Sequence, residues 1–117
     1  MENRRRQMRK RLVSLTVVLD AKSGEVMGRV ANLTTDGLML SSDRALAIDR
    51  SYSLQIQLPD EVAGRTQIEL EARSLWSQRA VDPTYYATGF EILNLSDSDR
   101  HVIEVLIQDA VFQRWVS

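Results

Sequence analysis

The stretch VMGRVANLTTDGLML, residues 26–40, has the pattern of two β-strands separated by a turn. Apolar residues dominate residues 26–33, and the β-branched ones among them favour a strand. The residues Thr35-Asp36-Gly37 interrupt this pattern, because Asp and Gly are typical of turns. The short apolar run 38–40 then predicts the next strand.

The same alternation of apolar runs and turn residues continues on both sides of this stretch. Lys22-Ser23-Gly24 predicts a turn between residues 26–33 and an earlier strand, so the two strands form a hairpin. Pro59-Asp60 is expected to end a later strand, and residues 59–65 to form a polar loop. The further strands are predicted at residues 12–19, 51–58, 68–76 and 85–93.

The last part of the chain changes from strand to helix periodicity. Ser96 followed by Asp99 resembles a capping box, and apolar residues then recur three or four positions apart. We expect one amphipathic helix over about residues 97–115. About six short strands and a terminal helix predict a small barrel or sandwich with the helix packed on it.

The charge is distributed unevenly along the chain. Its 117 residues fit one domain and carry a net charge of −1. Six of the fifteen basic residues lie between Arg4 and Arg11, whereas residues 12–117 hold nine basic and fifteen acidic residues, a net charge of −6. We therefore expect a flexible arginine-rich arm at residues 1–11 and a single domain at 12–117. Such an arm docks on its own domain or binds an anionic partner.

Several classes of protein find no support in the sequence. The chain has no cysteine, which excludes disulfides and thiolate metal sites and is compatible with the cytoplasm, the location we expect. Apolar runs are too short for membrane insertion, and the basic N-terminus lacks the apolar segment of a secretory signal. His101 is the only histidine, and no nucleophile–base pair, metal-ligand spacing or phosphate loop is present. We expect a non-enzymatic protein without a metal or cofactor.

Two segments can carry binding chemistry. The arm contains RRQMR at residues 5–9, and guanidinium groups bridge phosphate oxygens, pair with guanine edges or stack on bases. Residues 32–37, NLTTDG, offer an amide at Asn32, a hydroxyl at Thr34 and a glycine that permits a positive φ or a close approach of the backbone to a ligand. Alone, the first is an ordinary solvated basic arm and the second an ordinary polar turn.

Taken together, the two segments resemble the motifs of the PilZ domain family. That family has an RxxxR motif before the first strand and a (D/N)xSxxG motif after the second. Residues 5–9 match the first motif, and residues 32–37 match the second except that Thr34 replaces serine. The stretch GFEI at 89–92 resembles the family's last strand, and LSDSDR at 95–100 resembles the entry to its C-terminal helix.

The resemblance implies an all-β fold, a six-stranded antiparallel β-barrel with a C-terminal α-helix, that binds cyclic di-GMP. It also implies that arginines contact the phosphates and guanines, whereas the second motif contacts guanine and holds the loop. Trp76 is a further candidate, for stacking on guanine, although a core or rim position fits it equally. Carried over, the ligand-binding residues are Arg4, Arg5, Arg9, Asn32, Thr34, Gly37 and Trp76.

Three functions remain open from the sequence. The first is a cyclic di-GMP receptor that changes conformation and regulates an unidentified partner protein. The second is an adaptor of the same fold that binds no nucleotide, which the threonine at position 34 favours. The third is a nucleic-acid-binding barrel, but residues 12–117 are acidic and lack interleaved aromatic and basic residues. We therefore expect no nucleic-acid partner.

Overall fold

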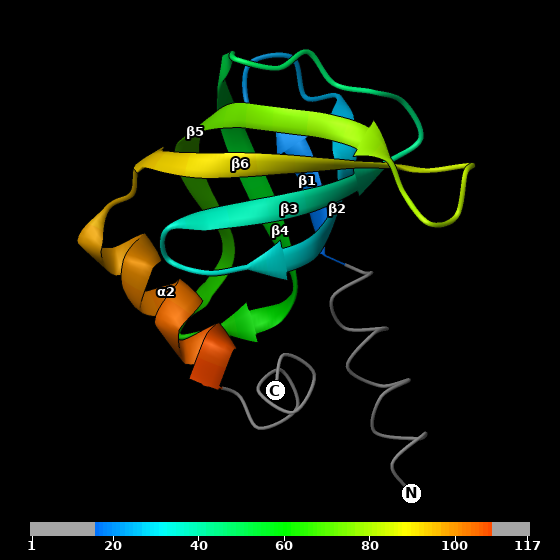
Figure 1. Cartoon of the computed structure of the whole chain (residues 1–117). Coiled ribbons are helices and arrows are strands. Elements are labelled where there is room, and N and C mark those ends of the chain that lie inside the picture. Colours follow the sequence, from blue (N-terminus) through cyan, green and yellow to red (C-terminus); the bar gives the residue numbers. More distant parts are fainter. Residues whose placement is uncertain (1–15, 109–117) are drawn as a thin grey trace, which may run out of the picture.

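Six strands form a closed barrel in the computed structural model, which describes residues 16–108 (Figure 1). All neighbouring strands are antiparallel, and their order around the barrel is β1-β2-β3-β6-β5-β4. The pairing of β1 with β4 closes the sheet. The strands are β1 (Val17–Asp20), β2 (Val26–Leu33), β3 (Gly37–Ser42), β4 (Ser51–Val62), β5 (Arg65–Arg79) and β6 (Tyr86–Asn94). The predicted all-β barrel is thereby confirmed.

Alternating side chains fill the barrel interior. In β4, Leu54 and Ile56 are fully buried, while their neighbours Ser53 and Gln55 face outward and bond to β5. The partner strand β5 contributes Ile68 directly opposite Ile56. This arrangement follows from the period of two in a strand, which sends every second side chain to the core.

The β4–β5 hairpin corrects one prediction. Residues 59–65 are not a polar loop, because β4 continues through Pro59 to Val62 and β5 begins at Arg65. The strands are joined by the two-residue turn Ala63-Gly64, whose φ angles of 50° and 78° are those of a type I′ turn. A register shift lies between Gln57 and Val62, and a proline is tolerated at such an irregularity because no ladder hydrogen bond is required of it.

The other boundaries differ from the sequence prediction by a few residues. Residues 12–15 of the first predicted strand lie outside the described residues, as does the arm at 1–11. The third strand is longer than the apolar run 38–40 and extends to Ser42. The helix α2 (Asp97–Gln108) begins as predicted, and the rest of the expected helix, to about residue 115, lies outside the described residues.

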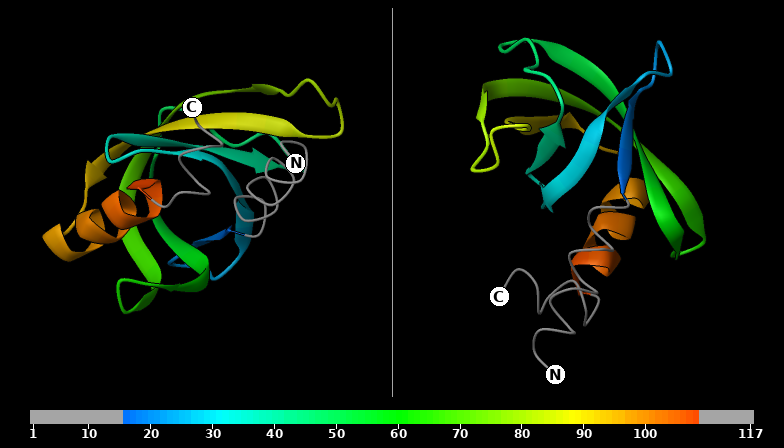
Figure 2. Two further views of the ribbon diagram at one scale, coloured as in Figure 1. Left: turned by 90° about the horizontal axis from the view of Figure 1, so that it is seen from below. Right: turned by 90° about the vertical axis from the view of Figure 1, so that its right-hand side faces the viewer.

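Helix α2 covers one end of the barrel (Figures 1 and 2). The Ser96 hydroxyl caps it by accepting a hydrogen bond from the backbone N–H of Asp99 at 3.1 Å. Its apolar side, Val102, Ile103 and Leu106, joins the barrel core. Among residues 16–108, no helix combines the length and the apolar character needed to cross a bilayer.

Asp99, in the first turn of α2, also bonds to the barrel. Its carboxylate is buried and forms an ion pair with Arg65 of β5, with 2.8 Å between Oδ1 and a guanidinium nitrogen. The other oxygen accepts the backbone N–H of Glu69 at 3.3 Å. Asp99 therefore ties α2 to β5 rather than simply facing the helix dipole.

Candidate functional site

The turn between β2 and β3 is held by the hydroxyl of Thr34. Its Oγ1 accepts the backbone N–H groups of Asp36 and Gly37 at 3.2 and 3.1 Å, and the Thr34 N–H donates to the Gly37 carbonyl at 2.9 Å. These bonds need only a hydroxyl two or three residues before the amides, which serine and threonine both supply. Thr34 therefore stabilises the turn as the family's serine would.

Gly37 does not have a positive φ, but its backbone comes close to that of β6. Among the described glycines, only Gly24 and Gly64 have positive φ values. A Cβ at Gly37 would instead stand 2.6 Å from the backbone carbonyl oxygen of Phe90. The glycine is required because β3 and β6 come close together at this point.

Asn32 faces outward because β2 contains a bulge. The pairing with β3 shifts between Val30 and Asn32, so Ala31 is the extra residue and both Arg29 and Asn32 are exposed. Asn32 Oδ1 accepts the N–H of Leu33 at 2.9 Å. Its amide nitrogen has no hydrogen-bond partner among residues 16–108, so two donors remain directed to the surface.

A second bulge brings Trp76 to the same outer surface. The pairing of β5 with β6 shifts between Ser74 and Trp76, and the change takes the chain from a buried Ser74 to an exposed Leu75 and Trp76. Trp76 keeps 39% of its surface exposed. It is therefore a surface tryptophan and not a core residue.

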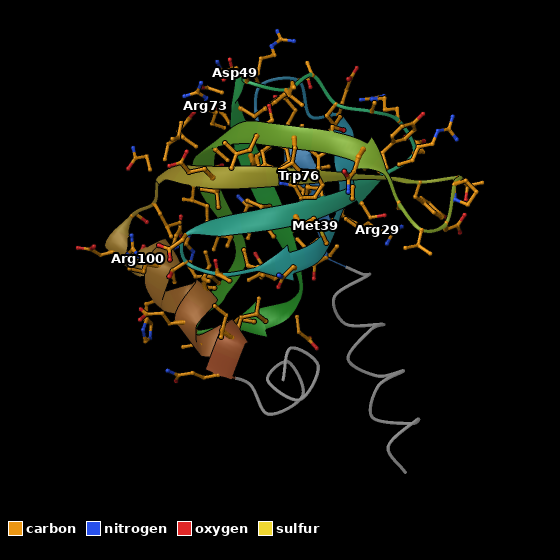
Figure 3. The ribbon with its side chains drawn as sticks, in the orientation of Figure 1. Arg29, Met39, Asp49, Arg73, Trp76 and Arg100 are labelled. Carbon is orange, nitrogen blue, oxygen red and sulfur yellow. The ribbon has the colours of Figure 1, made fainter. Side chains whose placement is uncertain are left out.

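Strand register places two of the candidate residues, Asn32 and Trp76, in one row. Asn32 pairs with Met39, Met39 with Gly89, and Gly89 with Trp76, so the row crosses β2, β3, β6 and β5. Directly paired residues share a face of the sheet. Figure 3 shows Trp76 over β6 with Met39 beside it on the next strand. We call these four residues the outer row.

Met39, Gly89 and Arg29 were not predicted as site residues. Arg29 lies on the exposed side of β2, directly opposite Ser41. The period of two along each strand indicates that one face is exposed, but the two bulges and the pairing of β3 with β6 decide which residues share it. None of these features has a local sequence signal.

The predicted arginines Arg4, Arg5 and Arg9 lie outside the described residues. The chain enters the described part at Thr16, whose carbonyl accepts the N–H of Val30 at 2.9 Å. The described part of the chain therefore begins beside β2, next to the bulge that exposes Asn32.

The next charged positions beyond the outer row are Glu91 and Arg73, and Arg73 is bound by a residue from outside this row. Gly37 faces Glu91 across β3–β6, and Glu91 faces Arg73 across β6–β5. The Arg73 guanidinium binds the Asp49 carboxylate, with 3.0 Å from Nε to Oδ1. The hydrogen bond and charge of Asp49 raise the pKa of the Arg73 guanidinium above its ordinary value. Arg73 therefore stays positively charged, and its guanidinium is already bound to Asp49.

The fold and surface define a class of protein: a small antiparallel barrel closed by a helix, with a polar turn and an exposed tryptophan on one face. The sequence profile described as "PilZ domain" matches residues 3–109. The chain belongs to the PilZ domain family.

Solved structures agree with this fold. The Bacillus subtilis inhibitor of motility, MotI/DgrA, is 21% identical with a TM-score of 0.57, over 76% of this chain and 46% of its own. The PlzA protein of Borreliella burgdorferi, solved in complex with c-di-GMP, is 13% identical with a TM-score of 0.54, over 90% of this chain and 46% of its own. The chain thus spans less than half the length of either protein. No curated protein matches the sequence.

Proposed function

We propose that this PilZ domain is a receptor, rather than an enzyme, that binds cyclic di-GMP, changes conformation on binding and regulates a partner protein. The observation that carries the proposal is the outer row, which brings Asn32 and Trp76 to one face beside the turn held by Thr34. Membership of the family and the PlzA complex with c-di-GMP support the choice of ligand.

The ligand has two purines and two phosphates, and the candidate residues offer a group for each. Arg5 and Arg9, with Arg4 beside them, supply forked donors for phosphate oxygens and guanine edges. Asn32 presents amide donors to a base. Trp76 offers an aromatic surface, and stacking of a base on such a surface contributes about 1–3 kcal/mol.

Chain length allows the arm to reach this face. Arg9 precedes Thr16 by seven residues, which span at most about 25 Å when extended. The outer row crosses three inter-strand spacings, roughly 14 Å. The arginines can therefore contact a ligand anywhere along the row while the chain remains attached beside Val30.

Calorimetric titration with cyclic di-GMP tests the ligand. We expect saturable binding by the full chain and a loss of at least about tenfold in affinity for Arg9→Ala, because a charged hydrogen bond contributes about 1.5–3 kcal/mol. Arg11→Ala is the matched control, since it removes the same charge from the same arm outside the motif. Folded protein that gives no heat would refute the proposal, and equal losses in both variants would refute the assignment of Arg9.

The adaptor function, without nucleotide, remains the second candidate. It is favoured by the β5–β6 loop, which exposes Val81 completely and Tyr85 by 47%. The loop is held by its own bonds, including the Tyr85 N–H to the Asp82 carbonyl at 3.0 Å. A partner captured equally well with and without cyclic di-GMP would favour the adaptor, whereas nucleotide-dependent capture would favour the receptor.

A further inference from the structure

Gly89 lies in the middle of β6, where its backbone does not require glycine. It pairs with Met39 on one side and Trp76 on the other, and its φ is not positive. Glycine inside a strand weakens the strand, because it loses more conformational freedom on folding than other residues and contributes no side chain. Glycine is therefore needed at this position because a larger side chain would have no room.

The indole of Trp76 fills that space. A Cβ added at Gly89 would meet three indole atoms, Nε1, Cε2 and Cζ2, with only 2.7 Å to Cζ2 and less to the other two. In proteins, a Cβ atom is essentially never found within 3.0 Å of a non-bonded heavy atom. The tryptophan thus lies directly against the backbone of β6, on the outer surface seen in Figure 3.

The backbone around Trp76 is fixed, so an added methyl group cannot be accommodated by moving β5. Ser74 Oγ donates to the Ala47 carbonyl at 2.8 Å, and the Ser74 N–H donates to the Arg50 carbonyl at 2.9 Å. On the other side, the hydroxyls of Ser77 and Thr88 are 2.9 Å apart. The clash is therefore relieved by rotation about the side-chain torsions of Trp76, which moves the indole.

We infer that Gly89 is a positioning residue for Trp76: the missing side chain keeps the indole against β6, in line with Met39 and Asn32, where a purine base of the ligand can stack. The purine part of this inference rests on the proposed function. The positioning part does not, because it concerns the protein without ligand.

The first experiment follows the indole in the free protein. Trp115→Phe leaves Trp76 as the only tryptophan. In this background, Gly89→Ala should shift the emission to longer wavelength and increase quenching by acrylamide, because the indole leaves the sheet. Unchanged emission and quenching in folded Gly89→Ala would overturn the positioning role.

The second experiment is a double-mutant cycle of Gly89→Ala with Trp76→Ala, measured by denaturant unfolding and by titration with cyclic di-GMP. With Trp76 present, Gly89→Ala should lower stability and weaken binding about tenfold. With Trp76→Ala, the same substitution should leave binding unchanged and should no longer lower stability, because alanine is then free of the clash and favours the strand over glycine. If the single variant fails to fold, folding of the double variant supports the inference, and failure of both overturns it.

Gly37→Ala is the matched control for stability. Its added Cβ would meet the Phe90 carbonyl and not a side chain, so Trp76→Ala should not rescue it. Equal rescue of both glycine variants would overturn the specific link between Gly89 and Trp76. If the parent protein binds no cyclic di-GMP, the proposed function and the purine part fail together, while emission and stability still decide the positioning role.

Discussion

At the scale of single residues, Thr34 shows how one hydroxyl organises the candidate site. It accepts two backbone N–H groups at 3.1–3.2 Å, and these amides would otherwise lack partners within the turn. The side-chain methyl takes no part in these bonds. The departure from the family's serine is therefore compatible with an intact turn.

We predict that Thr34→Val destabilises the domain by about 1–2 kcal/mol, because it keeps the shape but removes the acceptor. Thr34→Ser should change the free energy of unfolding little. Thr35→Val is the control in the same turn, since the Thr35 side chain makes no hydrogen bond within residues 16–108. Urea unfolding measures all three, and a stable Thr34→Val variant would contradict this role.

Asp82 gives a residue-scale prediction of pH dependence. The hydroxyl of Thr84, and then its N–H at 3.0 Å, hold the pKa of the Asp82 carboxyl below its ordinary value of 3.8. A lowered folded-state pKa means that the stabilisation is present above this ordinary value, which applies to the unfolded chain, and is lost as the pH falls through the folded value.

We therefore predict that Thr84→Val raises the pKa of Asp82 in an NMR titration and reduces the loss of stability below about pH 4. The loss of the hydroxyl leaves only the backbone donor. Thr66→Val, on the distant part of β5, should leave the Asp82 titration unchanged. Identical Asp82 curves in wild type and Thr84→Val would show that the hydroxyl does not stabilise the carboxylate.

At the scale of elements, the long β4–β5 hairpin is joined by the tightest turn of the barrel. Its first central residue, Ala63, has a φ of 50°, a region that disfavours residues with a Cβ. Gly64 follows with the φ of 78° that glycine tolerates. The hairpin thus carries local strain at one alanine.

We predict that Ala63→Asn stabilises the protein by about 0.5–1 kcal/mol, because Asn-Gly is the preferred pair for a type I′ turn. Gly64→Ala should have the opposite effect, since it places a second Cβ in the left-handed region. Thermal unfolding distinguishes the two. A melting temperature lowered by Ala63→Asn would contradict the turn assignment.

At the scale of the whole molecule, α2 closes one end of the barrel through apolar contacts and one ion pair. Arg65 and Asp99 are 34 positions apart in sequence and 2.8 Å apart in space. Asp99 also accepts the Glu69 N–H, so its loss would leave a backbone donor of β5 without its partner.

We predict that Asp99→Asn destabilises the domain by about 1–2 kcal/mol, a value reduced from that of a buried pair because the Arg65 side chain is 40% exposed. The matched control is Asp97→Asn, an exposed acid in the same first turn. Hydrogen exchange should show faster opening of α2 in Asp99→Asn alone. Equal exchange in both variants would refute the special role of Asp99.

Features that depend only on residues close together in the sequence could be predicted from it. The strands, the start of α2 at its Ser96 cap and the polar turn at 34–37 all follow from alternation, capping and turn chemistry within a few positions. The main local error was the loop at 59–65, where Pro59 is tolerated because the β4–β5 register is irregular there.

The sequence by itself therefore determined the family, the strand succession and the two motifs, including Asn32 and Thr34. Only the tertiary structure decided that Asn32, Met39, Gly89 and Trp76 form one row, that Gly37 serves the contact with β6, and that Asp99 pairs with Arg65. The physical reason is that turns and caps are stabilised by contacts within the chain's own neighbourhood. Strand partners, bulges and close approaches are selected by packing between distant segments, which no local pattern specifies.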